Sequence, residues 1–193
     1  MRRWSWQAFL VAAACLVSAC AEPPNKEMDQ AQGAIDAARA AGADRYAIVE
    51  YRAATTALKN SNDAVTQRDF RLALNYALES REHAQNSARE AADTKASLRA
   101  GFEREMAEVA ALLAQASTRL SASQRARVPA RALREPTADI EAANVAVQKA
   151  GEAVAEDNYL GAQAALQGVK DRIQKAVAAI DEAAASQSPR RRR

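Results

Sequence analysis

The chain has 193 residues, with 27 lysines and arginines against 24 aspartates and glutamates and a formal net charge of +3. Four of the basic residues form the run Arg190–Arg193, and two more lie in an N-terminal segment that we expect to be removed, which leaves 21 basic against 24 acidic side chains. The basic character is therefore a property of the tail, and it argues against a nucleic-acid-binding protein.

Residues 1–19 are predicted to be a signal peptide. Two arginines give a positive start, and residues 8–17 form an apolar run about half as long as a membrane-spanning helix. Trp4 and Trp6 are the only tryptophans of the chain. The processed protein should therefore have no indole absorbance.

The end of this segment resembles the bacterial lipobox. Val17 is an aliphatic residue three positions before Cys20, and Ser18 and Ala19 are small. Resemblance to lipoproteins implies cleavage before Cys20 and acylation there, and two or more acyl chains anchor a protein stably. The alternative is an ordinary secreted protein with Cys20 as a spare thiol. Because Cys15 leaves with the signal, no disulfide is possible within the mature chain.

The residue after the cysteine indicates the membrane to which a lipoprotein is sorted. Lipoproteins of bacteria with two membranes are retained in the inner membrane by aspartate at this position, where this chain has Ala21. The resemblance therefore implies the outer membrane, with the protein body in the periplasm. Residues 20–25, which include Pro23 and Pro24, are expected to form a lipidated tether.

Alanine dominates the mature chain. Its high helix propensity, the small net charge and a sustained apolar spacing of three and four residues favour helices over disorder. A buried methyl group contributes about 0.8 kcal/mol, against about 1.5–3 kcal/mol for a leucine side chain. Such helices must therefore pack closely, and we expect little room for an internal cavity.

The first helices are bounded by capping residues. Asn25 is a candidate N-cap of the first helix and Gly42 its C-terminal stop. Asp44 is expected to cap a second helix, which ends near Val65, and a third helix begins at Phe70.

Two alternatives remain for the third helix. Glycine costs only about 1 kcal/mol inside a helix, so residues 70–122 can form one rod of roughly 80 Å. Otherwise the helix breaks at Gly101 and a fourth helix folds back.

The later part of the chain contains two further predicted helices. Ser121 to Pro136 is predicted to be the longest irregular stretch, after which Thr137 caps a helix. The last helix is expected to start at Tyr159 and to fade through Ala185 into a disordered basic tail, residues 187–193.

A repeat with an offset of 89 residues organises these helices. The small and apolar residues between Tyr51 and Thr94 return in register between Ile140 and Ala183, and the turn 67–70 reappears as 156–159, with an N-capping residue before an aromatic one. The repeat predicts an all-α fold of two antiparallel helical hairpins with flanking helices, which share one long central helix if the rod is continuous. The predicted helical units are residues 26–100 and 101–186.

The two hairpins differ in polarity. The first has Ser80 and Ser87 where the second has Val169 and Ala176. We expect the first hairpin to be the softer unit, with its polar seam packed against the rest of the chain or a partner.

Few residues suggest catalysis. His83 is the only histidine, and on an alanine-rich helix it is expected to be a surface or seam residue. There is no cluster of histidines and thiols with metal-ligand spacing, and no phosphate-binding glycine pattern after a strand. We expect no catalytic residues, no metal and no cofactor, although a Ser/Asp/His combination stays open.

Arginines supply the candidate binding residues. Arg125, Arg127, Arg131 and Arg134 could dock an acidic partner, a lipid phosphate or an anionic cell-wall polymer, and the alternative is a solvated loop. The run Arg190–Arg193 could do the same by nonspecific attraction, and the alternative is a disordered solubilising end.

One stretch resembles a known family. Residues 37–47, Ala-Ala-Arg-Ala-Ala-Gly-Ala-Asp-Arg-Tyr-Ala, together with Leu58, Ala64 and Asp69-Phe70, resemble the bacterial envelope domain called domain of unknown function family 4398. Its members are alanine-rich helical proteins behind a signal or lipobox, some joined to an OmpA-like peptidoglycan-binding domain, and the family brings no known catalytic residues. A proline often follows the Tyr-Ala pair, where this chain has Ile48.

These observations predict a non-enzymatic periplasmic lipoprotein, anchored to the bacterial outer membrane, that acts as a helical scaffold or adaptor. Its expected partners are the membrane, through the acyl chains on Cys20, and an envelope protein or cell-wall component. The alternative is a helical periplasmic protein that binds a small ligand or lipid.

Overall fold

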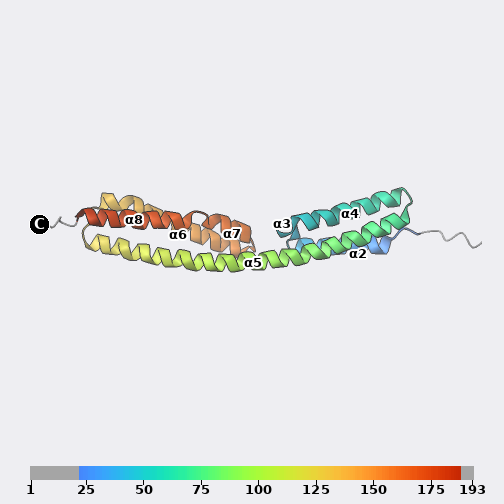
Figure 1. The fold of residues 1–193 in the computed structure, drawn as a ribbon, viewed down its shortest axis with the longest axis horizontal. Coiled ribbons are helices and arrows are strands. Elements are labelled where there is room, and N and C mark those ends of the chain that lie inside the picture. Colours follow the sequence, from blue (N-terminus) through green and yellow to red (C-terminus); the bar gives the residue numbers. More distant parts are fainter. Residues whose placement is uncertain (1–21, 188–193) are drawn as a thin grey trace, which may run out of the picture. The chain divides into compact units, whose positions relative to one another are not determined.

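The computed structural model describes residues 22–187, and this part of the chain contains helices and no strand. The predicted all-α fold is confirmed (Figure 1). The predicted signal peptide, Cys20 and the tail from residue 188 lie outside the described residues. The helices are α2 (Asn25–Ala40), α3 (Ala43–Tyr46), α4 (Ile48–Thr66), α5 (Phe70–Arg125), α6 (Ala130–Ala155), α7 (Tyr159–Leu166) and α8 (Val169–Gln187).

Two compact units divide the chain between Thr94 and Lys95, inside α5. α5 passes through Gly101 without interruption, so a break at Gly101 is wrong and the long central helix is confirmed. A Cβ atom added at Gly101 would have no other atom within 4 Å, so the glycine marks no close approach.

Unit 1 is built from α2, α3, α4 and the first part of α5. Ser61 Oγ donates to the carbonyl oxygen of Ala73, and Ser80 Oγ to that of Ala54, each at 2.8 Å. The two residue numbers of each pair have the same sum, which shows that α4 and α5 run antiparallel. Ile35 of α2 completes the core on this hairpin.

The serine seam of unit 1 is satisfied inside the unit. Ser61 and Ser80 bond to the opposite helix, and Ser87 donates to Ala84 of its own helix at 2.8 Å. No buried side-chain polar atom lacks a partner in the part of the chain that the structure describes. These hydroxyl groups therefore bond within the first hairpin itself, and the packing of this seam against the rest of the chain or a partner stays a prediction.

The corner between α2 and α4 contains part of residues 37–47, the stretch that resembles the known family, and its structure explains the residues found there. Gly42 has a φ of 88°, which favours glycine, and a Cβ atom there would lie 3.1 Å from Cδ2 of Tyr46. Ala43 and Ala47 are buried beneath this corner. The predicted stop at Gly42 is confirmed.

Asp44 does not cap the second long helix, contrary to expectation. The one-turn helix α3 contains Asp44, and α4 begins after it at Ile48 with no side-chain cap. Ile48 therefore occupies the first helical position, where a proline is well tolerated because its missing N–H has no partner there in any case.

The predicted cap at Asn25 is also wrong. Pro24 precedes the first helical residue, which is Asn25 itself, and no side chain caps α2. Of the expected tether, residues 20–25, the structure describes residues 22–25. Residues 22–24 are non-helical, and Asn25 belongs to α2.

Unit 2 packs the second part of α5 against α6, α7 and α8. Its core is more apolar than that of unit 1 and contains Val109, Leu133, Ile140, Ile173 and Ile180. Figure 1 shows α6, α7 and α8 lying along this part of α5.

Ion pairs define the register of α5 against the C-terminal helices. Lys95 Nζ lies 2.6 Å from Asp157, Lys170 Nζ lies 2.9 Å from Glu108, and Arg119 Nη1 lies 2.6 Å from Asp181. In each pair the residues are 62 positions apart. A constant difference, unlike a constant sum, means that α5 and α8 run parallel.

The repeat extends to the turns. Asp69 Oδ1 accepts a hydrogen bond from the backbone N–H of Leu72, and Asn158 Oδ1 accepts one from that of Gly161, both at 3.0 Å. Both predicted N-caps are confirmed, and the preceding residues, Arg68 and Asp157, share a positive φ. Six residues of the first hairpin and their counterparts 89 positions later are all buried: Ala73, Ala77, Ser80, Ala84, Ser87, Ala91, Ala162, Leu166, Val169, Ile173, Ala176 and Ile180.

The predicted irregular stretch from Ser121 to Pro136 is wrong, because only residues 126–129 of it are non-helical. Leu133, Pro136 and Ile140 are buried at helical spacing, and this packing outweighs the missing N–H of the proline. Thr137 lies inside α6 and donates to the carbonyl oxygen of Leu133 at 2.7 Å instead of capping the helix.

The last predicted helix is interrupted, so its prediction as one continuous helix from Tyr159 is wrong. α7 ends at Leu166 and α8 begins at Val169, with Gln167 extended and Gly168 at a φ of 74°. The buried spacing continues across the break from Leu166 to Val169, which is why the seam alone did not reveal it.

Candidate functional site

The turn between α5 and α6 closes with a C-terminal cap. The N–H of Arg127 donates to the carbonyl oxygen of Gln124 at 3.0 Å, and that of Val128 to Ser123 at 3.1 Å, which is the Schellman pattern. Arg127 takes the left-handed position with a φ of 62°, where glycine is the common residue. Val128, 6% exposed, is anchored in the core and holds the turn in place.

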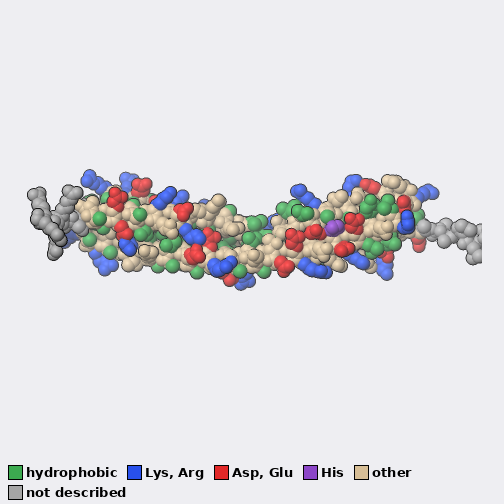
Figure 2. Space-filling model, in the orientation of Figure 1, with side chains coloured by type: hydrophobic (Ala, Val, Ile, Leu, Met, Phe, Trp, Pro, Cys, Tyr) green, Lys and Arg blue, Asp and Glu red, His purple; other side chains and the backbone are tan. Residues whose placement is uncertain are grey.

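This turn brings together the four arginines predicted as binding residues, and we call the set the arginine turn: Arg125, Arg127, Arg131 and Arg134. All four side chains are exposed. Arg125 Nε bonds to the carbonyl oxygen of Ser121 at 3.2 Å, yet none of the four forms an ion pair with a carboxylate of residues 22–187. Figure 2 shows Lys and Arg side chains at the end of unit 2 that carries this turn, with acidic side chains among them.

A depression of about 820 Å³ adjoins the arginine turn. Val128 and Leu133 are its buried lining residues, and Arg131, Arg134 and Glu141 are exposed around it. Six of its nine lining residues are exposed, so the depression lies at the surface. It is a surface depression and not an internal cavity, and only two of the four arginines line it.

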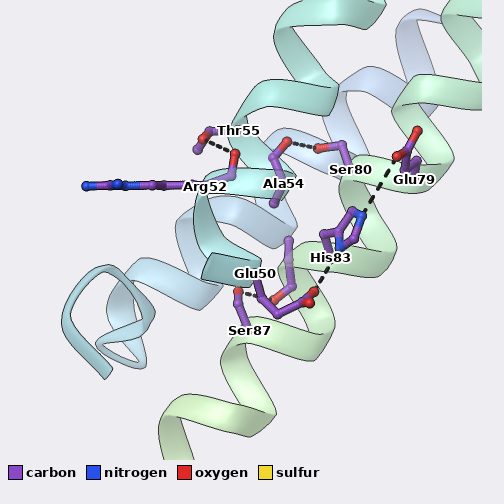
Figure 3. A network of polar contacts seen from close by, with 9 residues as sticks. Glu50, Arg52, Ala54, Thr55, Glu79, Ser80, His83 and Ser87 are labelled. Carbon is purple, nitrogen blue, oxygen red and sulfur yellow. Dashed lines mark hydrogen bonds and ion pairs between the residues drawn. The ribbon is translucent and has the colours of Figure 1, made fainter. Parts of the chain in front are cut away.

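A second polar cluster surrounds the only histidine (Figure 3). His83 Nδ1 lies 2.7 Å from Glu50 Oε2 of α4, and its Nε2 lies 3.8 Å from Glu79 Oε1, one turn earlier on α5. The histidine side chain is 30% exposed. The Glu79–His83 spacing of four is visible in the sequence, whereas Glu50 is 33 residues away and is brought to His83 only by hairpin packing.

The histidine cluster contains no activated nucleophile. The neighbouring hydroxyls of Ser80 and Ser87 are buried and donate to backbone carbonyl oxygens, and neither is bonded to His83. His83 contacts a carboxylate on each of the helices α4 and α5, and in this geometry no serine hydroxyl is placed for it to activate.

Within residues 22–187, no group of three or more histidine, cysteine, aspartate or glutamate residues could hold a metal ion. None of the described helices is both long enough and apolar enough to cross a membrane.

Residues 26–103 match the family described as a domain of unknown function, DUF4398. The match covers α2 from its second residue, all of α3 and α4, and the part of α5 up to residue 103, beyond the end of unit 1. The arginine turn lies outside the matched segment, in the repeated second unit. Neither a curated protein nor a solved structure matches the chain significantly.

Proposed function

We propose that this protein is a non-enzymatic lipoprotein of the bacterial outer membrane, whose helical units act as an adaptor for another component of the cell envelope. The observation that carries the proposal is the arginine turn, where four exposed guanidinium groups lie without a carboxylate partner in the described chain. Elsewhere in unit 2, cations between helices are paired, as Arg119 and Lys170 are. Exposed and unpaired arginines are suited to contact with an external anion.

The anchor is supported by the lipobox-like residues before Cys20 and by the similarity of residues 26–103 to DUF4398. Metabolic labelling with an alkyne analogue of palmitate should mark the protein, and Cys20→Ala should abolish the label. A labelled Cys20→Ala variant, or an unlabelled wild-type protein, would contradict the anchor.

The adaptor function is tested by crosslinking in cells from photoreactive residues. One probe replaces Ala130, which is exposed beside the arginine turn, and the control probe replaces Val145, which is 49% exposed on α6 of the same unit. A defined adduct from position 130 and none from position 145 is the expected result. If both positions give diffuse or no adducts while the lipidated protein is abundant, the adaptor function is wrong.

The surface depression favours a second candidate function, binding of a small ligand or lipid. Its volume of about 820 Å³ is within the range of ligand sites. Ligand sites, however, bury most of the ligand surface, and most of this lining is exposed. Native mass spectrometry of protein isolated from envelopes would support this candidate if a small molecule of constant mass stays bound to the wild type and is lost from Ala138→Arg, a change at an exposed position of the lining.

A further inference from the structure

The turn between α4 and α5 lies at the end of unit 1 where α2 begins. Arg39 Nε of α2 donates to Tyr51 Oη of α4 at 2.8 Å, and the two residue numbers add up to 90. Ile35 and Ala54, which share one core cluster, have nearly the same sum. This antiparallel register places Asn25, the first residue of α2, level with the last turn of α4. Figure 1 shows the start of α2 beside the turn.

The same end of unit 1 lies close to the proposed lipid anchor. Cys20 precedes Asn25 by five residues, and five residues of extended chain span at most about 17 Å. Acyl chains on Cys20 would therefore hold the start of α2 and the neighbouring turn near the membrane surface. The other end of α4, at Ile48, lies about 27 Å along the helix from its last residue.

The repeat supplies an internal comparison for this turn. Arg68 and Asp157 have nearly equal φ values of 61° and 59°, and the next residue caps the following helix in both copies. The sequences of the two turns nevertheless differ, because residues 67–72 are Gln-Arg-Asp-Phe-Arg-Leu and residues 156–161 are Glu-Asp-Asn-Tyr-Leu-Gly. Asp157 pairs with Lys95 inside unit 2. The shared turn geometry therefore does not require the arginines and the leucine of the first copy.

Four side chains of the first turn point to a contact outside the chain, and we call them the hairpin tip: Arg68, Phe70, Arg71 and Leu72. Leu72 is 38% exposed, and Phe70 is partly exposed where its counterpart Tyr159 is buried. Both arginines are exposed, and neither pairs with a carboxylate of residues 22–187. Figure 2 shows hydrophobic side chains at this end of unit 1, with charged ones among them. Apolar and basic side chains together are typical of segments that lie at a membrane interface.

We infer that the hairpin tip docks into the headgroup layer of the phospholipid membrane that holds the acyl chains of Cys20. Phe70 and Leu72 then reach the boundary of the lipid acyl chains. The guanidinium groups of Arg68 and Arg71 pair with lipid phosphates. The inference rests on the lipid anchor proposed above and names the part of unit 1 that the membrane covers.

The contact does not require a positive net charge. Asp69 accepts the N–H of Leu72 in the helix cap, Asp63 pairs with Lys59 at 2.8 Å, and Glu22 is exposed at the same end. These carboxylates offset the nearby cations, so long-range attraction to an anionic membrane is weak. The anchor supplies the proximity, and the burial of apolar side chains stabilises the docked state.

Tryptophan fluorescence tests the contact, because the processed chain should contain no tryptophan of its own. The complete acylated protein carries one reporter, either Gln67→Trp beside the hairpin tip or Val49→Trp, at a position that is 78% exposed near the other end of α4. Each protein is reconstituted in phosphatidylcholine vesicles with or without bromine atoms on the acyl chains, which quench tryptophan only at short range. We expect quenching of the reporter at position 67 and none at position 49. The quenching should persist as NaCl is raised, since salt screens charges and not apolar contacts.

Two variants that carry the Gln67→Trp reporter locate the contact. Leu72→Gln should lower the ratio of docked to undocked protein about fivefold, because an exposed apolar side chain is lost from the interface. Arg68→Asp should lower it by a similar factor, because a pair with phosphate is lost. Arg68→Asp also separates loss of docking from loss of folding, since aspartate takes the same left-handed φ at position 157.

Matched controls make the same changes near the other end of α4. Ile48→Gln and Arg52→Asp replace exposed residues there and should leave the ratio within about twofold of its original value. Equal quenching of the two reporters, or equal effects of the tip variants and the controls, would overturn the inference. Protein that does not float with the vesicles would overturn the lipid anchor and this inference with it. Protein that floats with an unquenched reporter at position 67 would leave the anchor standing and remove only the docked tip.

Discussion

Two buried serines of unit 1 have the same exposure and different partners. Ser80 bonds to the carbonyl oxygen of Ala54 on the opposite helix, whereas Ser87 bonds to that of Ala84 in its own helix. Ser80→Ala should lower the free energy of unfolding by about 1 kcal/mol, because an interhelical hydrogen bond is lost. Ser87→Ala should change it by less than about 0.5 kcal/mol, since alanine gains helix propensity. Urea unfolding measures both, and equal losses would contradict this account.

Glu108 gives stability a defined dependence on pH. The Lys170 ammonium, through its hydrogen bond and its charge, lowers the pKa of the Glu108 carboxyl below the ordinary value of 4.5, and the carboxylate raises the pKa of Lys170. A carboxyl whose pKa is lowered by folding stabilises the protein above its unfolded pKa. That contribution is lost as the pH falls through the lowered value.

Glu108→Gln should therefore weaken the protein at neutral pH and not at strongly acidic pH, where wild type and variant converge. The effect should be modest because the pair is exposed and because Glu105, 3.8 Å from Lys170, can partly replace it. Thermal unfolding across the acid range is the measurement, with Glu152→Gln, an exposed glutamate without an ion pair in residues 22–187, as control. If the unfolding temperatures of Glu108→Gln and wild type differed by the same amount at every pH, the ion pair with Lys170 would be excluded as the cause of that difference.

At the scale of the element, two glycines should respond to alanine in opposite directions. Gly101 lies inside α5 with open space around it, so Gly101→Ala should stabilise the protein by about 0.5–1 kcal/mol. Gly168 joins α7 to α8 at a φ of 74°, so Gly168→Ala should destabilise it by about 1 kcal/mol. Denaturant midpoints of the two variants test the pair. A stabilised Gly168→Ala would mean that α7 and α8 can join into one helix.

The elements that could be predicted from the sequence are those defined by local patterns. Asp69 and Asn158 cap their helices by bonds to residues three positions later, and the buried spacing around them recurs in each copy. Pro136 and Gly168 show the limit of such patterns. The proline stays helical because the surrounding stripe is buried, and the glycine breaks a helix whose seam continues.

At the scale of the whole molecule, the two units differ in what they bury. The fully buried side chains of unit 2 include Leu166, Ile173 and Ile180, whereas unit 1 has alanines at the matching positions. Larger buried side chains contribute about 1.5–3 kcal/mol each against about 0.8 kcal/mol for a methyl group. Amide protons of α4 should therefore exchange faster than those of α6 in the intact protein. Equal protection in hydrogen-exchange mass spectrometry would show that both units open together.

The candidate site was only partly predictable, because some of its features depend on the packing of segments that are distant in the sequence. The four arginines of the arginine turn are visible in the sequence, because no acidic residue stands between Arg125 and Arg134. Their exposure around one end of unit 2 depends on the cap at Arg127 and on helix packing. The Glu50–His83 contact likewise depends on the hairpin, so the pattern on α5 alone could not reveal it.

The parallel course of α5 and α8 also bears on how the protein is labelled for experiments. Gln187, the last residue that the structure describes, lies 62 positions after Arg125, at the same end of unit 2. An affinity tag or fluorescent protein joined within about six residues of Gln187 would begin within about 20 Å of it, in the neighbourhood of the arginine turn. A polyhistidine or acidic epitope tag there would compete with, or neutralise, the guanidinium groups. Interaction screens that rely on such fusions would then report partners of the tag.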